Sequence, residues 1–322
     1  MPLKAGKRRT KTRSRRRNVI GIKNRLQKNI RSQKGRYNRS TRRIQRGGEF
    51  NDITIAILSW KAPQTIRNTL DSYKQNNLLG LMKSLIYIQE RTAEEDALAA
   101  EYGIQKVLGT SENVGVLNAF IEMMHAVDTP YVIFAEDDFV LLHDESKLRG
   151  VLADCMKLCS EKGVKYVRLR DRKNPGEPLY SRLELDVDDS SLEAHDYKDF
   201  MYKAEMVHFL DNPDQKLPDV FTAVNPPELN YTWYLCDFMN SNWSSNIYMA
   251  DMEIIKNIIL PILEASTNST NTNFNKYHSI ERILVPPENK QKLDGVILAT
   301  GEGLFTHYRL DGVSQEKKMA RE

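Results

Sequence analysis

The chain has 322 residues, of which 40% are hydrophobic and 28% are charged, a composition typical of a globular protein. No stretch of about 18 apolar residues occurs, so the sequence predicts no membrane-spanning helix. The three cysteines show no metal-ligand spacing, and their odd number suits a reducing compartment and argues against a disulfide framework.

The net charge of +4 is unevenly distributed along the chain. Residues 1–48 contain 19 Lys and Arg and no acid, which leaves 28 Lys and Arg against 43 Asp and Glu in residues 49–322, a net charge of −15. So charged a segment, with few large apolar residues, predicts a disordered arm, called the basic arm below. Its charge suits nucleic-acid phosphates, an anionic membrane surface or a nuclear-type signal, and equally suits a solubilising tail.

Short apolar runs alternate with helical patterns over the next 120 residues. Buried-strand patterns occur at 53–59, 84–89, 104–108, 131–135 and 165–169, with helical patterns at 66–73, from 92, at 115–127 and at 146–162. This alternation predicts an α/β fold, a Rossmann-type, mostly parallel sheet flanked by helices on both faces. The regularity fades from 171 to 227. It returns as a strand pattern at 231–238, helical patterns at 252–263 and 280–285, and final elements at 296–298 and 303–308.

The apolar run that begins at Tyr131 ends in three consecutive acids, Glu136, Asp137 and Asp138. Adjacent carboxylates repel one another and need water or a cation as counter-charge. Ligands of parallel α/β sheets collect at the carboxyl ends of strands. Hard oxygen ligands there predict Mg²⁺ or Mn²⁺ carrying a phosphorylated ligand. The alternative is a solvated acidic turn.

Four features in this order resemble the GT-A-type, nucleotide-sugar-dependent glycosyltransferases, including family-2-like enzymes. They are the strand 53–59 with its break at Pro63, the turn Ser111-Glu112-Asn113-Val114-Gly115, the acid motif Glu136-Asp137-Asp138, and the segment Gly303-Leu304-Phe305-Thr306-His307-Tyr308-Arg309. The first acid, Glu136, is similar to that of N-acetylglucosaminyltransferases of N-glycan processing. The resemblance implies a GT-A-like domain at 49–322. Within it, 49–170 would be the nucleotide-sugar-binding half, and 171–322 a smaller acceptor-side half ending in a metal-site segment.

The resemblance also implies roles for individual residues. Asp138 would be the direct ligand of Mn²⁺ or Mg²⁺, and His307 would complete the coordination. Glu136 and Asp137 would accept hydrogen bonds from the ribose or from bound water, or would adjust the metal site. The loops nearest the nucleoside would supply Ser59, Lys61, Gln89, Glu90, Arg91, Asn113 and Gly115.

An inverting transferase also needs a general base to take the proton of the acceptor hydroxyl. Glu281 opens an apolar helix after a polar loop and is the preferred candidate, with Asp237 and Asp251 as rivals. The alternative for Glu281 is an acid that stabilises a helix N-terminus.

The sequence therefore predicts a metal-dependent hexosyl- or pentosyltransferase that uses a UDP- or GDP-sugar donor and a glycan or other hydroxyl acceptor. One alternative is a sugar-phosphate nucleotidyltransferase, although the loop 60–63 has none of the glycines expected to cradle a triphosphate. The other is a nucleic-acid-binding protein acting through the basic arm. Without a Golgi-type anchor, we expect a cytoplasmic enzyme of bacterial or large-DNA-virus origin, with the arm available for peripheral membrane contact.

Overall fold

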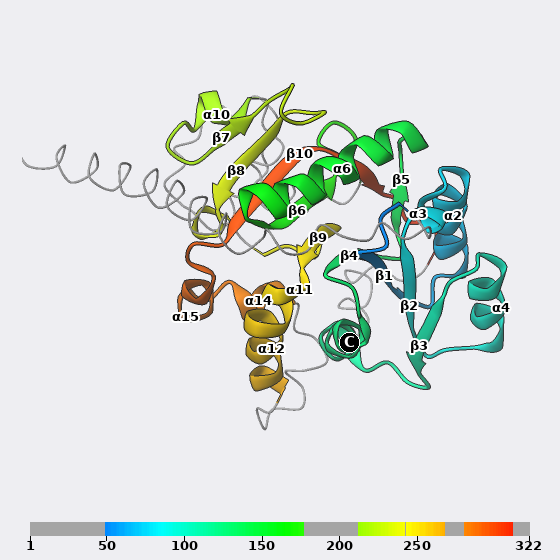
Figure 1. Cartoon of the computed structure of the whole chain (residues 1–322). Coiled ribbons are helices and arrows are strands. Elements are labelled where there is room, and N and C mark those ends of the chain that lie inside the picture. The colour runs from blue at the N-terminus through cyan, green and yellow to red at the C-terminus, as the bar shows by residue number, and fades with distance from the viewer. Residues whose placement is uncertain (1–48, 177–211, 242, 268–279, 312–322) are drawn as a thin grey trace, which may run out of the picture.

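The computed structural model describes residues 49–176, 212–241, 243–267 and 280–311 (Figure 1). The basic arm lies outside the described residues, so its predicted disorder and the boundary at 48 stay predictions.

The described part is organised around a ten-stranded sheet with the order β3-β2-β1-β4-β9-β6-β10-β8-β7, with β5 paired to β10. The strands are β1 Ile53–Trp60, β2 Lys83–Gln89, β3 Lys106–Thr110, β4 Tyr131–Glu136, β5 Phe139–Leu141, β6 Val164–Arg170, β7 Thr222–Val224, β8 Trp233–Asp237, β9 Tyr248–Asp251 and β10 Ile297–His307.

The sheet confirms the predicted α/β class. Strands β3, β2, β1 and β4 are parallel neighbours, as the strand–helix alternation predicts (Figure 1). Strand β9, which the sequence analysis did not predict, lies antiparallel between β4 and β6. Because β9 is antiparallel to both neighbours, β6 runs in the same direction as β4, and β10 runs parallel to β6. The carboxyl ends of β1, β2, β4 and β6 therefore share one edge.

Helices cover both faces of the sheet, and each face has its own cluster of buried hydrophobic side chains. The helices are α2 Pro63–Gln75, α3 Leu78–Leu81, α4 Ala93–Glu101, α5 Gly115–Ala126, α6 Glu145–Lys162, α10 Pro213–Lys216, α11 Met252–Ile254, α12 Leu260–Thr267, α14 Ile280–Leu284 and α15 Pro287–Lys290, with the short turns η1 Phe238–Asn240, η2 Ile255–Ile259 and η3 Gln291–Leu293. Helices α2, α3, α4 and α6 pack on one face, and α5, α12 and α14 on the other.

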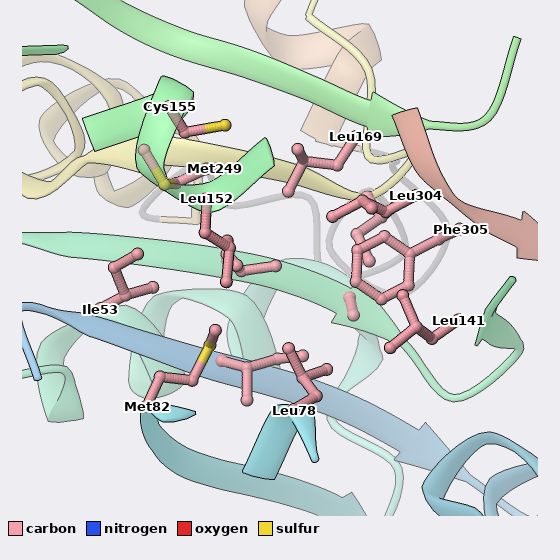
Figure 2. Close-up of a cluster of buried hydrophobic side chains, with 14 of the residues drawn as sticks. Ile53, Leu78, Met82, Leu141, Leu152, Cys155, Leu169, Met249, Leu304 and Phe305 are labelled. Carbon is pink, nitrogen blue, oxygen red and sulfur yellow. The ribbon is translucent and has the colours of Figure 1, made fainter. Parts of the chain in front are cut away.

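Figure 2 shows the first cluster, where apolar side chains of α6 meet those of the sheet. Leu152 of α6 lies with Ile53 of β1, Leu169 of β6 and Phe305 of β10, and all four are buried. Strands distant in sequence thus pack against the same layer of helices, and this packing holds in place the edge of the sheet that carries the acid motif.

The strand predicted before the acid motif is β4, which ends at the acids, and the chain turns there into a separate strand, β5, that pairs antiparallel with β10. One predicted helix is divided in the structure. The helix predicted at 252–263 is α11, a π-helical turn η2 and α12. Pro261 has no N–H to donate to the carbonyl one turn earlier, which explains the irregular turn before it.

Across the described ranges, no helix combines the length and apolar character needed to cross a membrane. Cys155, Cys159 and Cys236 are free and buried. Burial raises the pKa of the Cys159 and Cys236 thiols to about 12.

Candidate active site

The acid motif lies at the edge where β1, β2 and β4 end. Leu58 of β1 is paired with Glu136, and Trp60 is paired with Gln89 at the end of β2. The loops after β1 and β2 therefore begin beside the acid motif, as the sequence predicts for a parallel sheet.

Asp138 is deeply buried at this edge, with 1% of the residue exposed. Its Oδ2 lies 3.0 Å from His307 Nε2 and 3.2 Å from Arg309 Nη1. Its Oδ1 is buried without a hydrogen-bond partner. Burial alone would raise the pKa of Asp138, but His307 and Arg309 hold it below its ordinary value. Asp138 is thus an ionised, buried carboxylate with one oxygen still to be satisfied.

Asp137 points back into the fold. Its Oδ2 accepts hydrogen bonds from Ser59 Oγ at 2.9 Å and from the Trp60 backbone N–H at 3.1 Å. Burial, followed by the charge of Asp138, raises the pKa of Asp137 to about 7. Burial, followed by the charges of Asp138 and Asp137, holds the pKa of Glu136 well above its usual range. The fold therefore offsets the charge of Asp138 better than the charges of Glu136 and Asp137, which hold their protons more readily.

Helix α2 fixes the backbone of the acid motif through buried hydroxyls. Thr69 Oγ1 donates to the Asp137 carbonyl at 2.7 Å, and Tyr73 OH donates to the Phe139 carbonyl at 2.8 Å. Ser72 Oγ accepts a backbone N–H of β5 at 3.0 Å. The sequence analysis missed these residues, although hydroxyl residues at helical spacing on an otherwise apolar face were a usable signal.

Two of the predicted nucleoside contacts are instead internal. Ser59 is 2% exposed and its hydroxyl is engaged by Asp137. Gln89 is 3% exposed, and its Oε1 accepts the backbone N–H of Val114 at 3.0 Å. Their side chains join the loops of this edge, because each finds a protein partner on burial, and their contact with a nucleoside stays a prediction.

The residues that follow them do face outward. Lys61 and Glu90 form an ion pair, and Trp60 Nε1 donates to Glu90 Oε1 at 3.3 Å. Both Lys61 and Glu90 have positive φ, 48° and 55°, uncommon for residues with a side chain. Arg91 Nε pairs with Asp96 Oδ1 at 2.6 Å. These two residues of the left-handed region are joined by their ion pair where the neighbouring strands β1 and β2 end.

The predicted Asn113–Gly115 turn forms at the start of α5. Asn113 Oδ1 accepts the Gly115 backbone N–H at 2.8 Å. Gly115 has a φ of 82°, which favours glycine. Gln89 fixes this turn against the end of β2, so the turn belongs to the same edge.

The segment after β10 contributes residues that the sequence analysis gave no role. Tyr308 donates its backbone N–H to the Asp138 carbonyl at 2.7 Å. Arg309 reaches the carboxylate, and Asp311 hydrogen bonds to the N-terminus of α2. Gly303, with a φ of 83°, lies so close to the Arg170 backbone that no Cβ would fit, and the β10 register shifts at this bulge.

Glu281 lies in the first turn of α14, and its Oε1 accepts the Ser245 backbone N–H at 2.6 Å. Its charge helps to raise the pKa of Glu136, after burial and the two neighbouring aspartates. It also helps to raise the pKa of the buried Tyr248 phenol, after burial and Tyr166. The fold brings Glu281 to the edge of the acid motif, because Ser245 lies just before β9, whose first residue, Tyr248, pairs with Phe134 of β4.

The two rival bases lie at the opposite edge of the sheet. Asp251, at the end of the antiparallel strand β9, is paired with Tyr131, the first residue of β4, and forms an ion pair with Lys165. Asp237 is paired with Ile297, the first residue of β10. The predictions that Asp237 or Asp251 serves as base are therefore wrong, because antiparallel strands carry their carboxyl ends away from the acid motif.

The donor set around Asp138 fits a hard divalent cation. A carboxylate and an imidazole are suitable ligands, and the partnerless Oδ1 of Asp138 has a vacant acceptor position. Within the described ranges, no group of three or more His, Cys, Asp or Glu side chains is arranged to hold a metal. A cation here would thus take its remaining ligands from water or from a bound substrate, as Mg²⁺ commonly does.

No family model and no curated protein sequence matches the chain. Among solved structures, the chain is similar to TarS residues 1–349 of S. aureus, with a TM-score of 0.44 and 9% identity, covering 80% of this chain and 60% of that one. It is similar to the same TarS segment in complex with UDP-GlcNAc, with a TM-score of 0.45, 10% identity, and 81% and 59% covered. It is also similar to glucosyl-3-phosphoglycerate synthase of Mycobacterium tuberculosis in complex with Mn²⁺, UDP and phosphoglyceric acid. The TM-score there is 0.44 and the identity 14%, with 84% of this chain and 74% of that one covered. At such identities the similarity concerns the fold alone.

Proposed function

We propose that residues 49–322 form a metal-dependent glycosyltransferase that moves a sugar from a nucleoside-diphosphate sugar to a hydroxyl acceptor with inversion. One observation carries the proposal. Asp138 is a buried, ionised carboxylate at the carboxyl edge of the sheet, with His307 and Arg309 on one oxygen and no partner on the other.

Glycosyl transfer from such a donor leaves negative charge on the departing diphosphate. Asp138 and His307 would hold a divalent Mn²⁺ or Mg²⁺ ion, which when bound supplies electrostatic stabilisation of that charge. With two protein ligands in place, the diphosphate itself would complete the coordination. Asp137 would act indirectly, because its hydrogen bonds to Ser59 and Trp60 hold the acid motif against the first loop.

The nucleoside would bind over the loops after β1 and β2. Lys61 and Glu90 support this placement, since both are strained, both follow strand ends, and they meet in an ion pair beside the acid motif. Arg91 borders the same surface. The turn at Asn113 and Gly115 closes the edge where α5 begins, and it lets backbone approach the ligand.

The acceptor hydroxyl would give its proton to Glu281. Two observations support this role: the Ser245 backbone N–H orients the Glu281 carboxylate, and the charge of Glu281 helps to raise the pKa of Glu136, after burial and the two neighbouring aspartates. A positioned base of this kind contributes typically 10²–10⁴ to the rate.

The test is incubation of the full chain with a panel of UDP- and GDP-sugars, with Mn²⁺, with Mg²⁺ and with EDTA. We expect one donor to release nucleoside diphosphate only when a divalent ion is present, and release to increase with an acceptor. Release of equal size in EDTA would refute metal dependence. No release from any donor, together with release of pyrophosphate from a nucleoside triphosphate and a sugar phosphate, would favour a nucleotidyltransferase.

A further inference from the structure

The residues after β10 form a short strap between the acid motif and helix α2. The C-terminal strap is defined here as residues 308–311. At its first residue the Tyr308 backbone N–H donates to the Asp138 carbonyl. At its last residue the Asp311 carboxylate accepts the backbone N–H groups of Gln64 and Thr65 at 2.9 and 3.0 Å.

The strap places a cation on the carboxylate. Arg309 Nη1 lies 3.2 Å from Asp138 Oδ2, the oxygen that His307 also contacts. The guanidinium is also held by the strap itself, because its Nε donates to the Asp311 carbonyl at 2.9 Å. A carboxylate that is 1% exposed needs a counter-charge to remain ionised, and Arg309 supplies part of it.

The strap is attached by polar contacts rather than by a hydrophobic core. Besides the backbone bonds, Thr65 Oγ1 donates to Asp311 Oδ1 at 2.6 Å and accepts the backbone N–H of Leu310 at 3.0 Å. The large side chains of Tyr308 and Leu310 remain 53% and 49% exposed. Because hydrophobic stabilisation scales with the apolar area that is buried, release of the strap forfeits little of it.

We propose that Arg309 is the resident counter-cation of Asp138, and that its guanidinium on Oδ2 opposes the binding of a divalent cation to the partnerless Oδ1 of the same carboxylate. Two cations on one carboxylate repel each other, so metal loading weakens the contact of Arg309 and, with it, the attachment of the C-terminal strap. The inference rests on the proposed function, since it concerns regulation of the same metal site, and it assigns to Arg309 a part that opposes metal affinity.

The decisive experiment measures Mn²⁺ affinity, by electron paramagnetic resonance of the free ion, on the full chain without donor or acceptor. Arg309→Gln removes the competing charge and should bind Mn²⁺ roughly three- to tenfold more tightly, the range expected for a partly exposed ion pair. Arg67→Gln is the matched control. It makes the same charge change on α2, where Arg67 pairs with Glu101 at 3.0 Å, and should leave Mn²⁺ affinity unchanged.

A second variant, Asp311→Asn, loosens the strap while it leaves Arg309 in place. The asparagine side chain has an NH₂ group in place of one carboxylate oxygen, and this donor would face backbone N–H groups of α2, which are donors too. The strap is therefore held more weakly, and we expect a gain in Mn²⁺ affinity that is smaller than the gain in Arg309→Gln. In the unaltered chain, Mn²⁺ should accelerate tryptic cleavage after Arg309, measured as the peptide that begins at Leu310.

Mn²⁺ affinity that is unchanged or weaker in Arg309→Gln would overturn the inference, as would an equal gain in Arg67→Gln. These outcomes are separate from failure of the proposed function. A chain that releases no nucleoside diphosphate, yet binds Mn²⁺ more tightly as Arg309→Gln, would refute the transferase and leave the competition intact.

Discussion

Replacement of Asp138 by asparagine separates catalysis from stability at this site. The substitution keeps the shape of the side chain and removes its charge. The carboxylate lies 3.0 Å from His307 Nε2 and 3.2 Å from Arg309 Nη1, and the residue is 1% exposed.

The loss of activity should be large. One preorganised electrostatic contact to developing charge is typically worth 10²–10³ in rate, and Asp138→Asn would also remove the anionic ligand of the cation. We therefore expect metal-stimulated kcat/KM to fall by about 10²–10³, and Mn²⁺ affinity to fall with it.

Stability should change in the other direction or not at all. The charge of Asp138 is the second cause, after burial, that raises the pKa of Asp137 to about 7, so the neutral amide relieves repulsion within the acid motif. The lost ion pair with Arg309 is partly exposed and is worth about 0–1 kcal/mol. The thermal midpoint of Asp138→Asn should equal or exceed that of the unaltered chain in EDTA.

The assay is steady-state release of nucleoside diphosphate over a Mn²⁺ series, with thermal unfolding on the same preparations. Asp128→Asn is the matched control, since that carboxylate is exposed, pairs with Lys83, and precedes β4 at the opposite edge of the sheet. Near-normal, metal-stimulated turnover by Asp138→Asn would refute the assignment of the metal site.

Four further predictions follow from particular contacts. Glu281→Gln should lower transfer to the acceptor by about 10²–10⁴ with little change in donor binding, and normal transfer would remove it as base. Asp154→Ala should destabilise the fold by roughly 3–5 kcal/mol in denaturant unfolding, because its buried carboxylate accepts four hydrogen bonds from the loop that leads into β8, whereas a loss below 1 kcal/mol would contradict that reasoning. Although burial opposes it, hydrogen bonds from α2 lower the pKa of Asp311. Its contribution is therefore present above about pH 4 and lost as the pH falls through the lowered pKa, and hydrogen exchange of the Thr65 amide should accelerate only there. Deletion of the basic arm should leave the thermal midpoint nearly unchanged, and a large fall would place the domain boundary elsewhere.

The sequence was sufficient for the local features of residues 49–170. Apolar runs punctuated by helical patterns predicted β1 to β4 and β6 with their crossover helices, because local periodicity follows burial. The acid motif at the end of β4 follows from the same pattern, since the strand ends where the carboxylates begin. The sequence also predicted a helix start near Thr92, and in the structure Thr92 and Glu95 form a reciprocal capping box there.

Contacts between distant segments could not be predicted in this way. Strand β9 has only four residues, too few for a periodic signal, yet it lies in the middle of the sheet. It runs antiparallel to β4, so its carboxyl end lies at the edge opposite the carboxyl end of β4. The antiparallel direction of β9 places Asp251 at the edge opposite the acid motif, and the antiparallel pairing of β8 with β10 does the same for Asp237.

By itself, the sequence determined the α/β class, the position of the acid motif on a strand end, and the chemistry of its carboxylates. The tertiary structure decided which charges meet that motif. Arg309 and His307 reach Asp138 only because β10 turns at a bulge and its end pairs with β5, more than 160 residues earlier in the chain. Likewise, the buried hydroxyls of α2 find the acid turn only when the helix packs on the sheet. Local pattern reports which side chains are buried, whereas the partner of each buried polar group is set by packing between segments that the sequence keeps apart.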